Sequence, residues 1–161
     1  MVQNSLRDQL ALSLIDAVKE VFTSMLGSEV SVWEEKSEPV LPYPHDGVLS
    51  LIGLAGQWVG SGVLFCQSKT ACDLSTRLLM SEVTEVNDEV RDAVGEITNM
   101  VIGNFKNCLE TDGVEVRIST PTVIDGRHIK ARNLSSEFTV STWFKYADEH
   151  MFLVEVCLAQ L

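Results

Sequence analysis

Apolar and polar residues recur along this chain with two periods, and the changes of period separate predicted helices from predicted strands. Helical spacing covers residues 5–26, 68–80 and 87–109. Gly27 follows the first of these segments and is a typical C-terminal stop for a helix. Ser68 and Asn87 carry the side-chain oxygens that favour helix N-caps, so we expect the other two helices to begin there.

Strand patterns fill most of the remaining chain. Alternating segments occur at residues 29–33 and 114–120. Two pairs of apolar segments predict hairpins: "VLSLIGLAG" with "QWVGSGVLFC", and "SEFTVSTWFKY" with "HMFLVEVCLA" around the polar link "ADE". The proline-rich stretch at residues 37–47 reads as a loop.

The sequence also repeats itself. "DAVKEVFTSMLG" at residues 16–27 aligns without a gap with "DAVGEITNMVIG" at residues 92–103. Each copy precedes an alternating strand, a loop and a hairpin, so the chain contains two α-β-β-β units in tandem. We therefore predict a single α+β domain over residues 1–161. Its fold would be a pseudo-twofold repeat, with an antiparallel sheet carrying the two long helices on one face.

The charge balance limits the possible partners. The formal net charge is −11, with 23 acidic and 12 basic residues. Nucleic acids and anionic membrane surfaces are recognised by clustered Lys and Arg, so both are disfavoured. No apolar run reaches the roughly 18 residues of a membrane span, and the N-terminal stretch has a helical pattern rather than that of a signal peptide.

Cysteine and histidine residues show no site spacing. The four cysteines form no CxxC pair and are not spaced with histidine as in zinc sites. We expect isolated, mostly buried thiols in a reducing compartment, the cytoplasm. The three histidines, His45, His128 and His150, are scattered, and we interpret them as surface or loop residues.

One polar stripe stands out on the second long helix. At 100° per residue, Asp92, Glu96, Asn99 and Gly103 fall within an arc of about 60°. The opposite side carries the apolar residues Val90, Val94, Ile97, Val101 and Phe105. Most polar stripes are merely solvated, but asparagine is a poor helix former, and Gly95 and Gly103 each cost a helix up to about 1 kcal/mol. The stripe with its glycines thus predicts open ground that another protein can approach.

These residues resemble the CheC/CheX family of chemotaxis phosphatases, most closely its CheX branch. The family pattern has Asp or Ser, then Glu four residues on, Asn three further, and a Pro about twenty-two residues later. Here it reads "DAVGEITN" followed by Pro121, and "EITNMVIGNFK" and "STPTVIDG" are also close to the family's wording. The resemblance is specific over residues 86–126 and looser over nearly the whole chain.

The resemblance implies an enzyme that hydrolyses the aspartyl phosphate of a CheY-like response-regulator receiver domain. It implies that Glu96 engages a lysine of the receiver and that the Asn99 amide orients the attacking water. Asp92, Gly95 and Gly103 would belong to the partner-binding surface, and Pro121 would support the motif. No cofactor of the chain's own is expected, because the receiver brings its own Mg²⁺, and a homodimer is the expected assembly.

The first helix carries a different version of the stripe. Asp16 and Glu20 repeat the acids, but Thr23 stands where the second copy has Asn99, and Lys19 replaces Gly95. A threonine has no amide to orient water, so the first copy resembles a lapsed site.

Two other functions stay open at this point. The same surface could serve a non-catalytic receiver-binding or adaptor module in chemotaxis or flagellar signalling. An unrelated α+β ligand-binding domain would need a closed apolar pocket, for which the sequence shows no convergent polar set.

Overall fold

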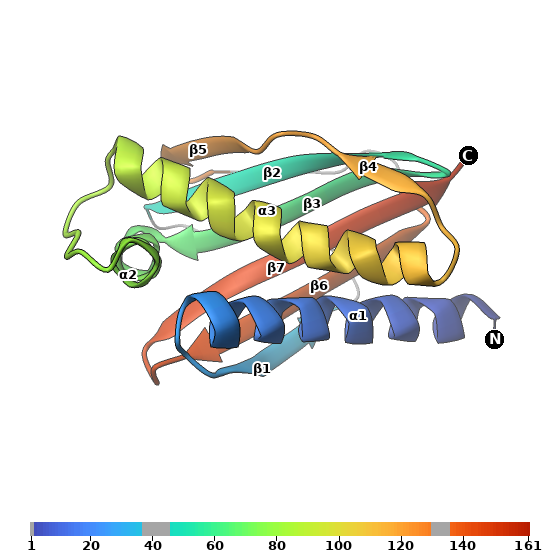
Figure 1. The fold of residues 1–161 in the computed structure, drawn as a ribbon, viewed down its shortest axis with the longest axis horizontal. Coiled ribbons are helices and arrows are strands. Elements are labelled where there is room, and N and C mark those ends of the chain that lie inside the picture. Colours follow the sequence, from blue (N-terminus) through green and yellow to red (C-terminus); the bar gives the residue numbers. More distant parts are fainter. Residues whose placement is uncertain (1, 37–45, 130–135) are drawn as a thin grey trace.

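The structure is a computed structural model that describes residues 2–36, 46–129 and 136–161. It confirms the predicted α+β class (Figure 1). In chain order its elements are α1 (Val2–Met25), β1 (Val30–Lys36), β2 (Gly47–Gly56), β3 (Trp58–Gln67), α2 (Ser68–Leu79), α3 (Asp88–Thr111), β4 (Val116–Ile118), β5 (Thr122–Gly126), β6 (Phe138–Tyr146) and β7 (His150–Gln160).

The strands form one antiparallel sheet whose order expresses the sequence repeat. The order is β1-β6-β7-β3-β2-β4, and β5 also pairs with β2. Exchanging the two halves of the chain replaces β1, β2 and β3 by β4, β6 and β7, and the order then reads the same from the opposite edge. The predicted pseudo-twofold arrangement therefore has its axis between β3 and β7. Both predicted hairpins, β2–β3 and β6–β7, are present.

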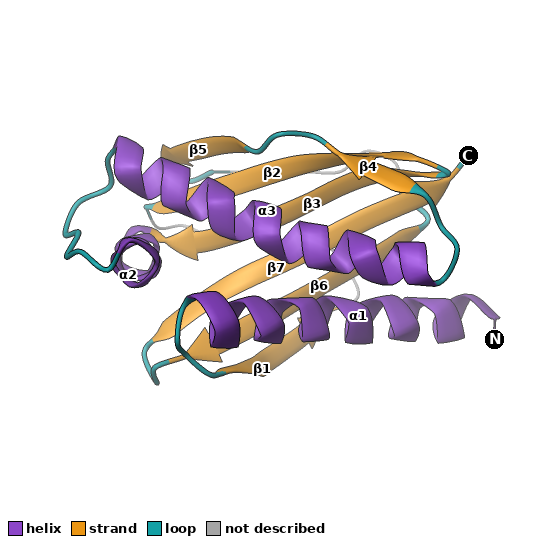
Figure 2. Cartoon of the chain, in the orientation of Figure 1, coloured by secondary structure: helices purple, strands orange, loops and turns teal. Residues whose placement is uncertain are grey.

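Both long helices cover the same face of this sheet, as predicted (Figure 2). They lie side by side and run in opposite directions, as the colour ramp of Figure 1 shows. The short helix α2 lies against the N-terminal part of α3. A twofold relation between two α-β-β-β units requires this antiparallel helix pair, so the repeated stripes of α1 and α3 come together on one surface.

The sheet buries apolar side chains on both faces because successive residues of a strand point to opposite sides. On β7, Phe152 and Val154 belong to the core beneath the helices. Leu153, between them, packs with Phe65 and Trp143 on the opposite face. The helix-side core is the larger of the two, and it fixes α1 and α3 on the sheet.

Three local details refine the sequence-based expectations. Gly27 has φ 60°, which confirms it as the left-handed residue after α1. Gln67, rather than Ser68, is the N-cap of α2, and its side chain makes no capping hydrogen bond. The predicted strand at residues 114–120 is shorter, and β5 was not predicted. The interruption between β4 and β5 includes Pro121, which has no N–H to donate to a ladder.

No helix within the described residues is long and apolar enough to cross a membrane.

Candidate functional site

Helix α3 begins with the predicted cap. The Asn87 side chain accepts a hydrogen bond from the backbone N–H of Val90 at 3.0 Å. Asp88 and Glu89 follow in the first turn, where negative charge suits the positive end of the helix dipole. The apolar side of α3, including Val94, is buried against the sheet. This burial fixes the rotation of the helix, so the opposite stripe is directed outward.

The stripe lies at the surface as predicted. Asp92 and Glu96 are exposed, and Asn99 and Gly103 are half-buried. Within the described ranges the Asn99 side chain makes no hydrogen bond, so its amide oxygen and nitrogen are both available to an incoming group. An amide both donates and accepts. The arrangement places an exposed carboxylate one helical turn from an amide on the same side of a rigid helix.

Gly95 differs from the expectation of open ground. It is buried, and a Cβ added there would lie 3.2 Å from Val123 Cγ2 and 3.4 Å from Pro121 Cγ. The glycine is needed because the segment around Pro121 packs directly on the helix, so this position is closed rather than open, and its assignment to the partner-binding surface stays a prediction. The same contact gives Pro121 a physical place in the motif: it lies against α3 at the residue before Glu96.

A second contact attaches this segment to α3. The Arg91 guanidinium donates to Asp125 Oδ1 on β5 at 2.5 Å and to Asp88 Oδ1 at 2.7 Å. The hydrogen bond to Asp125 is the main cause that raises the pKa of Arg91, and it lowers the pKa of the Asp125 carboxyl. Arg91 and Gly95, one turn apart on the same side of the stripe, therefore both contact the β5 segment, which limits the rotation of the helix turn that bears Asp92 and Glu96.

A groove of about 470 Å³ runs between α1 and α3 beside the stripe. From α3 it is lined by Asn99, Met100 and Gly103, among others. From α1 it is lined by Glu20 and Met25 together with their neighbours. This groove was not predicted from the sequence. The only sequence feature that pointed to the groove was the repeat. Two repeated stripes on neighbouring antiparallel helices lie on either side of the groove between them.

The histidines only partly follow their interpretation. His128 is exposed, and His45 lies outside the described residues. His150 was expected at the surface but is only 4% exposed. Its Nδ1 lies 3.0 Å from Thr70 Oγ1, and its Nε2 lies 3.7 Å from Asp73 Oδ1. This cluster joins α2 to the β6–β7 turn, away from the stripe.

The thiols agree better with expectation. Cys66, Cys72 and Cys157 are buried and Cys108 is half-buried, all as free thiols. Burial raises the pKa of Cys66 to about 12, which makes it a poor nucleophile. Within the described part of the chain, no three His, Cys, Asp or Glu side chains form a group that could hold a metal ion.

Comparisons with known proteins concern most of the chain. The family model "Chemotaxis phosphatase CheX" matches residues 48–145. The CheY-P phosphatase CheX of Thermotoga maritima is 29% identical over 122 residues, which are 75% of this chain and 78% of that protein. The crystal structure of the chemotaxis protein CheX from Vibrio vulnificus matches with a TM-score of 0.83 and 25% identity, over 94% of this chain and 99% of that one.

A further solved structure shares the fold. It is a CheX–CheY–BeF₃–Mg²⁺ complex from Borrelia burgdorferi, which matches with a TM-score of 0.80 and 24% identity over 92% of this chain and 96% of that one. Helices α1 and α3, with the sheet beneath them, therefore form an architecture that solved chemotaxis proteins share.

Proposed function

The chain belongs to the CheX family of chemotaxis phosphatases, and on that premise we propose that it hydrolyses the aspartyl phosphate of a CheY-like receiver domain. In the reaction, the oxygen of a water molecule bonds to phosphorus as the bond from phosphorus to the aspartate oxygen breaks. The products are inorganic phosphate and a free aspartate carboxylate on the receiver.

The observation that carries this proposal is the free amide of Asn99 beside the exposed carboxylate of Glu96 on one side of α3. Both side chains are presented by a helix whose rotation is fixed by a buried apolar side and by contacts to β5. A convex helix face that carries two polar groups suits insertion into a partner's cleft better than enclosure of a small molecule.

Asn99 is assigned to the water. An acyl phosphate is already labile, so the main requirement is to hold water in line with phosphorus, which is catalysis by positioning. The amide oxygen can accept a hydrogen bond from the water while the amide nitrogen donates to a phosphoryl oxygen or to the water oxygen. This chain then needs neither a nucleophile nor a general base, and the Mg²⁺ of the reaction is assigned to the receiver.

Glu96 is assigned to docking. Its carboxylate is exposed and lies one turn before Asn99, so it reaches the surface of a receiver into whose site Asn99 projects. A lysine ammonium on the receiver is the complementary group. Such a contact fixes the register of the two proteins more than it contributes to affinity.

Phosphate release is the test of this function. A CheY-like receiver from the same organism is phosphorylated with a small-molecule phosphodonor, and its loss of phosphate is followed with and without one-hundredth as much of this chain. We expect faster release with multiple turnovers per chain. Stoichiometric binding of the phosphorylated receiver without accelerated release would instead support the adaptor function.

A further inference from the structure

We propose that α1 supplies the second half of the receiver-docking surface, where Glu20 recognises a lysine or arginine side chain of the receiver in the groove between α1 and α3. This inference rests on the proposed function and deepens it. It assigns a role to the helix whose own stripe lacks the amide.

The groove lies beside the amide that the proposed function places at the phosphoryl group. Glu20 and Met25 of α1 line the same groove as Asn99 of α3. A receiver that places its phosphoryl group at Asn99 therefore covers this groove as well. Because the helices run antiparallel, residues 20–25 of α1 lie opposite the half of α3 that follows Asn99.

The shape of the groove suits a long aliphatic side chain. A Cβ added at Gly103 would meet nothing within 4 Å, so the groove is open above this residue. Met25 is 51% exposed although it is a large apolar residue, and Met100 is half-buried nearby in the lining. Lysine and arginine pack their methylene stems on such surfaces while keeping the charged end in a polar position.

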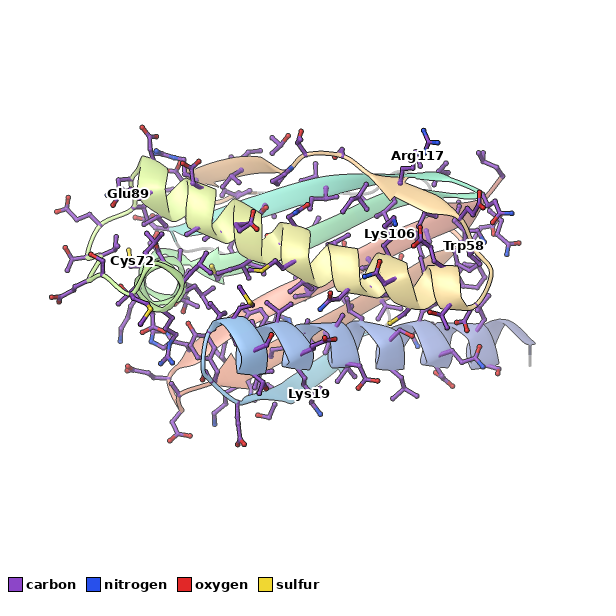
Figure 3. The ribbon with its side chains drawn as sticks, in the orientation of Figure 1. Lys19, Trp58, Cys72, Glu89, Lys106 and Arg117 are labelled. Atoms are coloured by element: carbon purple, nitrogen blue, oxygen red, sulfur yellow. The ribbon has the colours of Figure 1, made fainter. Side chains whose placement is uncertain are left out.

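The charge of the groove selects a cation. Glu20 is exposed and forms no ion pair with any residue of the described ranges. Lys106 also lines the groove, but its Nζ lies 2.5 Å from Glu110 Oε1, so its charge is matched within α3 (Figure 3). The carboxylate of Glu20 is therefore the uncompensated charge of this lining.

The thiol of Cys108, next to the groove, lies in the same negative potential. The pKa of Cys108 on α3 is raised by burial first, and then by the carboxylates of Asp16, Asp112 and Glu20. Two of these three carboxylates come from α1. A cation that enters between the helices meets the field of both.

The experiment compares two charge reversals on the same helix. Glu20→Lys changes the groove, whereas Asp8→Lys makes the same change of net charge at an exposed position roughly 18 Å away along α1. Each chain is titrated with a CheY-like receiver of the same organism held in its active form by beryllofluoride and Mg²⁺, and phosphate release is measured over a range of receiver concentrations.

Glu20→Lys should weaken binding about tenfold or more and raise KM by a similar factor, while kcat at saturating receiver stays near the wild-type value. Asp8→Lys should change both constants less than about twofold, and Glu20→Asp should retain most of the affinity. Added salt should weaken the wild-type complex more than the Glu20→Gln complex.

Equal binding by Glu20→Lys and Asp8→Lys would overturn the inference and leave the phosphatase function standing. Failure of the proposed function has a different signature, since the wild-type chain would then not accelerate phosphate release at all. The titration still decides in that case: selective loss of binding in Glu20→Lys supports the docking role of α1, and absence of binding by the wild-type chain rejects it.

Discussion

Helices α1 and α3 are copies of one sequence pattern on one face of one sheet, yet they present different surfaces. Asp16 and Glu20 of α1 are exposed, as are Asp92 and Glu96 of α3. The copies diverge after the shared acids, because α1 continues with a threonine where α3 continues with Asn99. Under the proposed function, the shared acids serve docking on both helices, and the amide of Asn99 distinguishes the catalytic helix from the other.

Gly27 and Gly103, the last residues of the two aligned segments, have different structural roles although the residue type is the same. Gly27 has φ 60° and terminates α1, whereas Gly103 lies within α3, which continues to Thr111. A similar divergence separates Lys19 from Gly95. Lys19 is exposed and points from α1 away from α3 in the view of Figure 3, while Gly95 is buried beneath Pro121.

Replacing the amide should produce the largest effect. Asn99→Ala is expected to lower turnover on the order of 10²-fold, the usual cost of one well-placed catalytic polar group. Binding of a beryllofluoride-activated receiver should be nearly unchanged, because the amide acts on water in the transition state. Steady-state phosphate release beside a binding titration measures both. Full turnover in Asn99→Ala would eliminate the water-orienting mechanism and favour the adaptor function.

Reversing the charge of Glu96 should mainly affect docking. Glu96→Lys is expected to weaken receiver binding by roughly 10- to 100-fold, as for an interfacial charge contact of a few kcal/mol at most. The salt dependence of binding should also fall relative to the wild-type chain. Isothermal titration at two salt concentrations checks this. A variant that binds normally but has lost turnover would move Glu96 from docking to chemistry.

A substitution at Gly95 tests whether α3 tolerates the lysine that α1 carries at the equivalent position, Lys19. Gly95→Lys should destabilise the fold by about 1–3 kcal/mol, because even its Cβ would crowd Val123 and Pro121. The reciprocal change, Lys19→Gly, should cost only the helix propensity of an exposed site, up to about 1 kcal/mol. Urea unfolding of both variants measures the difference. Equal losses would mean that the β5 segment yields easily and does not hold the helix.

Sequence patterns predicted most of the fold because its elements are long and strongly periodic. The hairpins and the antiparallel twofold arrangement followed from alternation and repetition, and the cap at Asn87 followed from its side-chain oxygen at the start of the helical pattern. The stripe was found because Asp92, Glu96 and Asn99 share one side of one helix, which is local information. The α1 residues that lie across the groove from this stripe could not be found in the same way, because contacts between α1 and α3 depend on how the sheet brings the two helices together.

The errors have the same origin. Gly95 was interpreted as open because its helix neighbours are polar, but the residue that covers it, Pro121, lies 26 positions further along the chain. His150 was interpreted as a surface or loop residue because the three histidines are scattered without site spacing, yet it is buried in contact with Thr70 of α2. The unpredicted β5 is short, and its pairing with β2 is visible only in the folded sheet.

Gly103 should behave in the opposite way to Gly95. Gly103→Ala adds a methyl group that meets nothing within 4 Å, so it should gain helix propensity and stabilise the protein by up to about 1 kcal/mol. Thermal unfolding checks this gain. The methyl group should also narrow the groove and weaken receiver binding by a factor of about two to five. The equivalent glycine of the first copy, Gly27, is not a suitable site for the same change, because its positive φ favours glycine. Destabilisation by Gly103→Ala would show that the groove above α3 is closed in solution.

The smallest effect concerns the ion pair between Arg91 of α3 and Asp125 of β5. The first copy lacks this pair, because α1 has the apolar residue Ile15 at the position of Arg91. The hydrogen bond from Arg91 lowers the pKa of Asp125 in the folded protein, so the pair stabilises the fold above the unfolded pKa of about 3.9. That contribution should be lost as the pH falls through the folded pKa. Since the Asp125 side chain is 34% exposed, Asp125→Asn should lower Tm by only about 1–2 °C at pH 7.

The pH profile distinguishes this contact from simple packing. The Tm difference between wild type and Asp125→Asn should be constant from pH 7 to about pH 5. It should shrink as the pH falls below about 4, because the unfolded carboxyl is protonated first and the folded carboxyl, whose pKa is lowered, is protonated further down. Asp92→Asn is the matched control, because Asp92 follows Arg91 on α3 and its exposed carboxylate forms no ion pair within the described residues. The Tm difference between wild type and this variant should change little with pH. A Tm difference for Asp125→Asn that stays the same down to pH 3 would mean that the contact between Arg91 and Asp125 acts through shape and not through charge.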